Sequence, residues 1–410
     1  MTARPRLLFL GYTLPYPLDS GAAIRTFHLL RLLAREFDVT AVCFSRRKGG
    51  AVPQHDLPER LAAVRRVVEL EAFPVPQEYS AGRLVWDHLC SVALHRAHTV
   101  FSFDSQAVVA HIRELLRTRR FDLIHVDSVF LSRYLPQFDG IPVVLGHQNV
   151  ESELWRRRAA VEGAPWRRLY LRHQARLLAR EERDWCPRCT LNLVVSEDDR
   201  LTLERRIPGA SFAVVPNGVD LESFRPSPNG EARGLVFVGE STWFPNRDGL
   251  RYFCDAILPQ VRAACGAVPL RWVGRAPELL RREFRDRYAV ELTGYVPDVR
   301  PYVREAACYI VPLRVGGGTR LKILDAWAMG KAVVSTTVGC EGLAARDGEN
   351  ILIRDDPQSF AEAVRLVLQE PTLRARLGAE GRRTVERLYS WERIGDVLLR
   401  LYRPLARDRR

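Results

Sequence analysis

The chain has 410 residues, of which 47% are hydrophobic and 27% charged, and its net charge is +13. This length exceeds a single typical core and predicts two domains, and the composition is that of a soluble globular protein. No apolar run approaches the roughly 18 residues that a membrane-spanning helix requires, and the first apolar run is too short for a signal peptide.

The positive charge is almost entirely arginine, since only Lys48, Lys322 and Lys331 among the 62 basic residues are lysine. This bias is typical of a genomic composition effect, and we expect no nucleic-acid partner. Such a net charge still favours anionic partners, such as phosphorylated ligands or acidic lipid surfaces. The eight cysteines form no disulfide framework, which predicts a reducing, cytoplasmic compartment. Cys186 and Cys189 form a lone C-x-x-C pair, and we expect no metal site there.

The first half of the chain alternates short apolar strands with amphipathic helices, which predicts a parallel α/β domain. A strand over 6–11 precedes a helix over 21–37, and a second strand follows over 38–45. Later strands of this half are predicted over 121–127, 141–146, 190–196 and 212–215.

A turn-rich linker is predicted over 216–230, and a second alternation of strands and helices follows it. Its strands are predicted over 235–239, 270–274, 290–294, 308–313, 332–336 and 351–354, and residues 373–403 are predicted to be helical. We therefore predict a first Rossmann-like domain over 1–215 and a second over 231–388. A C-terminal helix within 389–410 is expected to pack back on the first domain.

The most informative segment, residues 311–343, predicts a strand, a glycine turn, a short helix and a second strand. Gly316, Gly317 and Gly318 form the turn and allow a ligand to approach the main chain closely. Thr319 is a candidate N-cap of the helix, and Gly330 is a candidate for its end.

The start of this helix has the features of an anion site. Arg320 and Lys322 fall in its first turn, beside backbone N–H groups that have no helical partner. Asp325 lies on the same face as Lys322 and offers a carboxylate to sugar hydroxyls. A plain ion pair between Lys322 and Asp325 is the alternative. The segment matches neither the G-x-G-x-x-G fingerprint nor a P-loop.

This order of features resembles the family 4 glycosyltransferases of the GT-B type, and the resemblance covers nearly the whole chain. It rests on the loop and helix that begin at Gly21, the linker 215–220, the segment 294–301, the glycine motif 316–334 and the segment 389–392. The resemblance implies two Rossmann-like domains that face one another across a cleft. It also implies a nucleotide-sugar donor, a retaining reaction and no required cofactor or metal.

The resemblance assigns roles to individual residues of the second domain. Arg320, Lys322 and the backbone N–H groups of the glycine turn and Thr319 would hold the diphosphate. Asp325 takes the position of the second glutamate of the family's signature, which binds ribose hydroxyls. Gly317 takes the position of the first, which contacts the donor sugar. The remaining substrate-binding candidates of this domain are Glu240 and Arg247, near positions where the family has basic groups, and Val296, beside the nucleobase.

In the first domain the substrate-binding candidate is Gly21 and the catalytic candidate is His147. The segment His147-Gln-Asn-Val-Glu151 resembles a family segment in which a histidine at a strand end faces the donor sugar. A buried histidine that is hydrogen-bonded at the strand end is the alternative interpretation.

The acceptor cannot be identified from these motifs. The segment 156–188 has ten arginines against four acids, interleaved with aromatic residues, which predicts either a peripheral contact with anionic membrane or a solvated helix face. Two other functions share the fold, namely a GT-B epimerase or phosphorylase and a nucleotide-sugar-binding protein with impaired catalysis. The second is suggested by Gly317 and Glu240.

Overall fold

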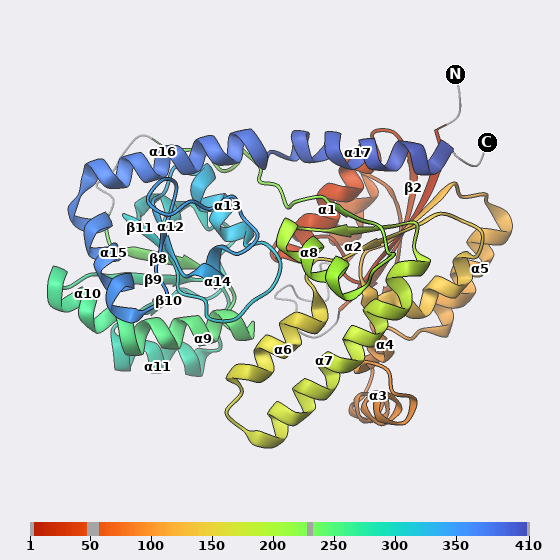
Figure 1. Ribbon diagram of the computed structural model, residues 1–410, viewed down its shortest axis with the longest axis horizontal. Helices are drawn as coiled ribbons and strands as arrows, with labels where there is room; N and C mark the ends of the chain where they lie inside the picture. The colour runs from red at the N-terminus through yellow and green to blue at the C-terminus, as the bar shows by residue number, and fades with distance from the viewer. Residues whose placement is uncertain (1–3, 47–56, 228–232, 408–410) are drawn as a thin grey trace. The chain divides into compact units, whose positions relative to one another are not determined.

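The computed structural model describes residues 4–46, 57–227 and 233–407. These residues form two compact units (Figure 1). The N-terminal unit contains the chain up to Pro216 and again from Glu392 onward, and the C-terminal unit is Asn217–Trp391.

The N-terminal unit is built on a seven-stranded sheet with the order β3-β2-β1-β4-β5-β6-β7, and every pair of neighbouring strands is parallel. Its central strands are buried along nearly their whole length, which explains why the sequence reads as continuous apolar runs. The strands are β1 (Arg6–Gly11), β2 (Asp38–Ser45), β3 (Glu69–Pro74), β4 (Leu123–Val126), β5 (Val143–Gly146), β6 (Leu191–Val194) and β7 (Phe212–Val214).

Helices connect these strands and cover the sheet. They are α1 (Gly21–Leu33), α2 (Leu57–Arg65), α3 (Ala81–Leu94), α4 (His98–Ser102), α5 (Gln106–Thr118), α6 (Glu151–Val161), α7 (Pro165–Trp185) and α8 (Glu197–Arg206). Among the described residues of this unit, 3₁₀ segments lie at Pro76–Glu78, Val129–Phe138 and Cys186–Arg188. The helix predicted over 21–37 ends at Leu33, because β2 begins only five residues later.

The C-terminal unit has a six-stranded parallel sheet with the order β10-β9-β8-β11-β12-β13. In this order the chain runs outward from β8 in one direction and then returns beside β8 with β11. This is the strand order of a dinucleotide-binding Rossmann fold. The strands are β8 (Leu235–Val238), β9 (Leu270–Val273), β10 (Glu291–Leu292), β11 (Cys308–Val311), β12 (Val333–Ser335) and β13 (Leu352–Ile353).

A continuous core joins this sheet to its helices, with Trp272 and Trp327 fully buried in it. The helices are α9 (Phe244–Tyr252), α10 (Leu258–Cys265), α11 (Glu278–Tyr288), α12 (Arg300–Glu305), α13 (Leu321–Ala328), α14 (Thr337–Cys340), α15 (Pro357–Gln369) and α16 (Pro371–Leu388). A π-helical turn, Phe253–Ile257, joins α9 to α10.

The C-terminal helical region is two helices rather than one. After α16 the chain is extended at Ser390, which bridges to Val219, and α17 (Trp391–Arg407) then begins. Helix α17 packs on the N-terminal unit, where the Tyr402 hydroxyl lies 2.6 Å from Nδ1 of His125 and Arg403 pairs with Glu36.

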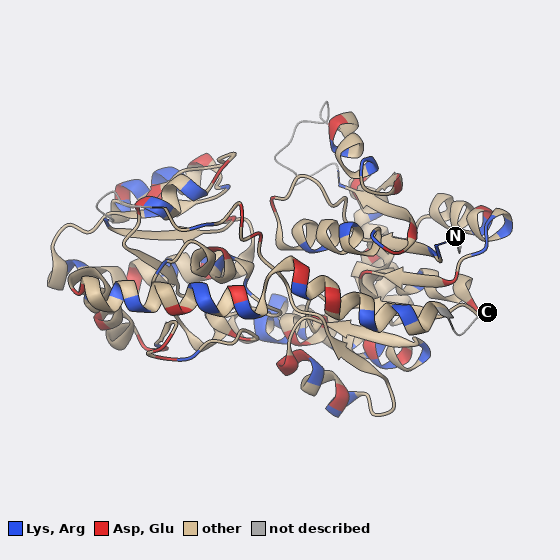
Figure 2. Ribbon diagram, turned by 90° about the horizontal axis from the view of Figure 1, so that it is seen from above, with Lys and Arg blue, Asp and Glu red and all other residues tan. Residues whose placement is uncertain are grey.

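Charged residues of both signs are interspersed along the outer helices (Figure 2). Many form i,i+3 or i,i+4 ion pairs, such as Arg200 with Glu197 and Glu204. None of the helices within the described ranges is long and apolar enough to cross a lipid bilayer.

Candidate functional site

The candidate site lies where the strand order of the C-terminal unit reverses, at the adjacent carboxyl ends of β8 and β11. Connections leave these two strands in opposite directions, and ligands of open α/β sheets bind in the crevice that results. Gly239 and Glu240 follow β8. The glycine turn and helix α13 follow β11.

The side chain of Arg320 binds the glycine turn through its backbone carbonyl groups. This guanidinium is 8% exposed and donates to the carbonyl oxygens of Gly317, Gly318 (2.8 Å) and Val338 (3.3 Å). A Cβ atom at Gly316 would displace the guanidinium from this position, and Gly318 has a φ of 63°, which favours glycine. Arg320 therefore fixes the turn in place.

The carbonyl groups of the turn accept hydrogen bonds, but the three backbone N–H groups after Gly316 find no acceptor among the described residues. Within the described residues, the backbone N–H groups of Gly317, Gly318 and Thr319 donate no hydrogen bond. Three neighbouring N–H groups that lead into the N-terminus of a helix form an anion-binding arrangement.

The predicted cap of this helix is wrong. Helix α13 begins at Leu321, its N-cap is Arg320, and no side chain caps it. The hydroxyl of Thr319 instead accepts a hydrogen bond of 2.6 Å from Nδ2 of Asn217. The predicted helix end is correct, since Gly330 follows the helix with a φ of 67°.

Lys322 points at the carboxyl end of β8. Its ammonium donates to Oδ1 of Asn246 over 2.8 Å and lies 3.8 Å from the centre of the Phe237 ring. A Cβ atom at Gly239 would stand 2.7 Å from this ammonium and would displace it from this position. Burial, and to a lesser degree the Arg320 guanidinium, lower the pKa of Lys322 well below its usual value. An anion beside the ammonium would offset both effects.

The ion pair between Lys322 and Asp325, which was the alternative interpretation of the sequence, is absent among the described residues. The Asp325 carboxyl has no hydrogen bond or ion pair within these ranges. Burial, and then the neighbouring Asp220 carboxylate, raise the pKa of Asp325 to about 7. A half-buried carboxyl without a protein partner is suited to hydroxyl groups of a ligand.

The two predicted substrate-binding residues Glu240 and Arg247 have different surroundings in the structure. Oε1 of Glu240 accepts from the Thr242 hydroxyl (2.5 Å) and lies 4.0 Å from Nη1 of Arg275. Arg275 also covers the Tyr295 ring at 5.3 Å and is a basic residue of this edge that the sequence motifs did not single out. Arg247 is exposed on α9, directly after Asn246, and its role in donor binding stays a prediction.

The nucleobase candidate lies on the neighbouring strand connection. Val296 is partly buried against the core of the C-terminal unit, two residues after Gly294, which bridges to Gly274. Gly274 in turn approaches Gly239, because a Cβ atom at Gly274 would lie 2.5 Å from the Gly239 carbonyl oxygen. The backbones that follow β8, β9 and β10 therefore meet at one edge.

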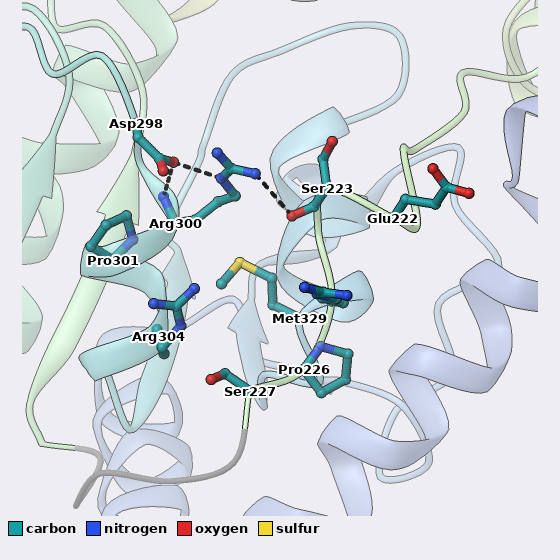
Figure 3. Close-up of a pocket in the computed structure, with 10 residues that line it drawn as sticks. Glu222, Ser223, Pro226, Ser227, Asp298, Arg300, Pro301, Arg304 and Met329 are labelled. Carbon is teal, nitrogen blue, oxygen red and sulfur yellow. Dashed lines mark hydrogen bonds and ion pairs between the residues drawn. The ribbon is translucent and has the colours of Figure 1, made fainter.

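A pocket of about 620 Å³ lies one helical turn beyond Asp325, at Met329 (Figure 3). It is basic, and Arg300 in its wall is held by Asp298 (2.8 Å) and by the carbonyl of Ser223 (3.2 Å). None of the predicted donor-binding residues lines it. The full lining is Glu222, Ser223, Arg225, Pro226, Ser227, Asp298, Arg300, Pro301, Arg304 and Met329.

In the N-terminal unit, His147 is placed in the core. The ring is 3% exposed, its Nε2 lies 3.2 Å from Oδ1 of Asn192, and burial lowers the pKa of His147 to about 4. The histidine therefore has the position that the alternative interpretation of the sequence describes. Its role as a catalytic residue stays a prediction, which the structure does not test.

The next residue, Gln148, lies against polar side chains at the carboxyl end of β4. Its amide donates to Oδ2 of Asp127 over 3.3 Å, and the Thr26 hydroxyl donates to the same oxygen over 2.5 Å. Asp127 follows β4, Thr26 lies on α1, and Gly21 is the exposed first residue of that helix. The sequence motifs did not single out Gln148, but this residue directly follows His147 in the segment that they did single out.

The described residues contain no group of three or more histidine, cysteine, aspartate or glutamate side chains that could hold a metal ion. Cys186 and Cys189 are both buried in the core of the N-terminal unit, and burial raises the pKa of the Cys189 thiol to about 12.

Comparison with protein families decides the relationship. A family model described as Glycosyltransferase Family 4 matches residues 20–223, and a model described as Glycosyl transferases group 1 matches residues 232–370. The chain belongs to the family 4, group 1 glycosyltransferases. The two matches cover the two units in turn.

Among curated relatives of this glycosyltransferase is phosphatidyl-myo-inositol mannosyltransferase of Mycobacterium tuberculosis (strain H37Rv). It is 29% identical over 213 residues, which are 48% of this chain and 55% of the relative. The corresponding protein of Mycobacterium leprae is 27% identical over 209 residues, with the same shares. The chain thus spans about half the length of the curated relatives it matches.

Solved structures show the fold of this glycosyltransferase over nearly its whole length. Sucrose-phosphate synthase from Thermosynechococcus elongatus matches with a TM-score of 0.69 and 19% identity, over 98% of this chain and 99% of that chain. HepE of Anabaena, in complex with UDP and glucose, matches with a TM-score of 0.66 and 13% identity, over 97% and 99%. The predicted α/β class with two Rossmann-like domains, the GT-B fold, is confirmed.

Proposed function

We propose that this chain transfers a sugar from a nucleotide-diphosphate-sugar donor to an acceptor, with retention of configuration and without a required cofactor. The observation that carries this proposal is the arrangement around the glycine turn. Three unpaired N–H groups, the Lys322 ammonium and the unpartnered Asp325 carboxyl lie on one turn and one helix at the switch point of a Rossmann-type sheet.

The chemistry of glycosyl transfer needs these groups. As the bond to the sugar breaks, negative charge grows on the departing diphosphate while the sugar becomes oxocarbenium-like. Donors that are already in position stabilise that charge without reorganising. Lys322 is such a donor because Asn246 and the Phe237 ring hold its ammonium in place. The N–H groups of the turn supply a second, fixed set of donors.

Asp325 suits the ribose of the donor. Its carboxyl lies three residues after Lys322 on α13, so both side chains project from the same side of the helix. An ionised carboxylate accepts two hydrogen bonds from the paired hydroxyls of a ribose. UDP is the nucleotide in the HepE complex, and UDP-sugars are therefore the first donors to test.

The test is to incubate the purified chain with labelled UDP- and GDP-sugars and to measure transfer and hydrolysis, alongside calorimetric binding of UDP and GDP. Turnover of one donor, with release of its nucleoside diphosphate, is the expected result. Retention is read from the anomeric configuration of the product. If the chain turns over no donor and also binds no nucleotide, the proposal is contradicted.

A second candidate is a protein that binds a nucleotide-sugar without transferring it. Two observations favour it. Gly317 supplies no carboxylate to the donor sugar, and Glu240 places an acid, associated with Arg275, at the end of β8. Tight nucleotide binding without turnover of any donor would select this function.

We further propose a cytoplasmic location. All eight cysteines are free, and six of them are buried, as is usual for proteins of a reducing compartment. The acceptor of the sugar is unassigned.

A further inference from the structure

The pocket at Met329 is enclosed by three segments of the C-terminal unit and lies apart from the glycine turn. Its walls are the linker segment 222–227, the beginning of α12 and the end of α13. Met329 is 5% exposed and lies between the other two walls (Figure 3). Seven residues separate it from Lys322, which corresponds to about 10 Å along α13. A ligand in this pocket is therefore distinct from a diphosphate at the glycine turn.

Hydrogen bonds from residues outside the pocket hold its walls in place. The Arg382 guanidinium donates to the carbonyl oxygens of Phe224 (3.0 Å) and Ala328 (2.6 Å), and so joins the linker segment to α13. The Lys331 ammonium donates to the Arg304 carbonyl oxygen over 2.6 Å, and so joins α12 to the chain that follows α13. The pocket is therefore formed before any ligand binds, as small-molecule sites usually are.

Three arginines line the pocket, and one of them is fixed by protein contacts. Nε of Arg300 donates to Oδ1 of Asp298 over 2.8 Å, and its Nη1 donates to the Ser223 carbonyl over 3.2 Å (Figure 3). The guanidinium groups of the other two, Arg225 and Arg304, form no hydrogen bond or ion pair with any described residue. Two cations in the walls are therefore available to an anion.

The charge of the pocket favours a ligand with a phosphate group. Arg300 and Arg304 are four residues apart on α12, so both project from the same side of that helix. Among the described residues, the acids that line the pocket are the paired Asp298 and Glu222, which points away from Met329 (Figure 3). Guanidinium groups match the oxygen atoms of a phosphate through paired hydrogen bonds, and several arginines together bind a doubly charged monoester.

The size and the apolar surfaces of the pocket require more than a phosphate ion. Its volume of about 620 Å³ falls within the range of roughly 300–1,000 Å³ that small-molecule sites have. Met329, Pro226 and Pro301 supply apolar surface beside the arginines. Pro226 packs at the end of α13, since a Cβ atom at Gly330 would lie 3.5 Å from its ring. A compact organic group fits against these three side chains.

We propose that the pocket at Met329 is a second ligand site of this chain, which binds a small organic phosphate monoester. Arg225, Arg300 and Arg304 hold the phosphate, and the apolar side chains of the pocket contact the organic group. The site does not depend on the proposed sugar transfer, and its test measures binding alone.

Calorimetry of the full chain at constant ionic strength tests the site with two probes, inorganic phosphate and phenyl phosphate. We expect phenyl phosphate to bind more tightly, because its ring adds contacts with the apolar surface. Arg225→Gln and Arg304→Gln should each weaken the binding of both probes roughly tenfold or more, as the loss of a charge-assisted hydrogen bond does. Neither substitution removes a contact of the folded chain, since both guanidinium groups are unpaired among the described residues.

Met329→Ala separates the two parts of the ligand. It removes apolar surface and no charge, so it should weaken the binding of phenyl phosphate and leave that of inorganic phosphate unchanged. Retained binding of inorganic phosphate also shows that this variant is folded. Equal affinity of the wild type for the two probes would overturn the assignment of an organic ligand.

Two controls show where the probes bind. Arg176→Gln, at an exposed and unpaired arginine of α7 within the described residues, should bind both probes as the wild type does, because net charge alone is then not the cause. Lys322→Ala should also retain both affinities, since Lys322 belongs to the donor site. Binding of neither probe, an equal loss in Arg176→Gln, or loss of binding in Lys322→Ala would overturn the proposal.

Discussion

The ammonium of Lys322 donates a hydrogen bond of 2.8 Å to Oδ1 of Asn246, a residue 76 positions earlier in the chain. Asn246 is 6% exposed, and its Nδ2 donates to the Glu240 carbonyl over 2.9 Å. The amide therefore links the end of β8 to the first turn of α13. It positions the cation that the proposed mechanism uses.

Removal of this cation should impair the chemical step. Lys322→Ala should lower turnover by a factor on the order of 10²–10³, as the loss of one preorganised electrostatic group does. Steady-state kinetics with the donor found in the screen measures this. Arg285→Ala, at an exposed site on α11, is the control and should have wild-type rates. Full activity of the Lys322 variant would exclude it from the phosphate site.

Asn246 should act through Lys322. Asn246→Ala frees the ammonium and should lower kcat/KM roughly 10- to 150-fold, because a hydrogen bond to a charged group contributes about 1.5–3 kcal/mol. Asn246→Asp should be worse, because its carboxylate would neutralise the cation and repel the diphosphate. Aspartate has nearly the size of asparagine. A larger loss in Asn246→Asp than in Asn246→Ala would therefore show a role in positioning the ammonium, because lost packing would give the opposite order. Wild-type kinetics in both would contradict a positioning role.

Arg320 should act on the glycine turn before any ligand binds. A lysine at this position cannot reach the carbonyls of Gly317, Gly318 and Val338 together. We expect Arg320→Lys to increase amide hydrogen exchange of residues 312–321 in the ligand-free protein and to weaken donor binding about tenfold. If exchange is unchanged while binding weakens, Arg320 contacts the diphosphate directly, as the family resemblance implies.

Donor binding should depend on the ionisation of Asp325. Burial and Asp220 raise the pKa of Asp325 to about 7, so the carboxyl is protonated below this pH and ionised above it. Ribose hydroxyls donate to the ionised form, and donor affinity should therefore increase as pH rises from 6 through 8. A nucleotide-sugar is a suitable probe because its diphosphate has no group that titrates in this range. Calorimetry at several pH values measures the effect, and Asp325→Asn should give a flat profile.

His147 should contribute to stability and not to catalysis. Burial lowers its pKa in the folded state to about 4, below the value of about 6.5 in the unfolded chain. The folded state then binds fewer protons, so this histidine destabilises the protein as pH falls from about 6.5 towards 4. His147→Ala should lower the free energy of unfolding at pH 8 by about 2 kcal/mol, since it leaves a cavity, and should reduce the acid sensitivity. Chemical denaturation at pH 8 and pH 5 checks both effects. A large loss of kcat in a folded variant would restore the catalytic interpretation.

The alternation of apolar strands and amphipathic helices was sufficient to predict two parallel α/β domains, because buried parallel strands must be apolar along their whole length. The GT-B fold was implied by the resemblance to the family 4 glycosyltransferases. The glycine turn and the end of α13 at Gly330 were also predictable, since both depend on local backbone angles that favour glycine. Within the candidate site, the sequence placed the turn, Lys322 and Asp325 on consecutive elements.

Side-chain partners were not predictable, because they join residues that are far apart in the chain. The Thr319 hydroxyl lies against Asn217, 102 positions away, and so does not cap the helix. The Arg320 guanidinium is oriented in part by its hydrogen bond to the Val338 carbonyl. The buried His147 ring lies against the Asn192 side chain of the neighbouring strand. The sequence by itself determined the fold and the segment that forms the anion site, through local periodicity and backbone geometry. Only the tertiary structure decided which side chains remain available to a ligand, because availability is set by long-range hydrogen bonds and burial.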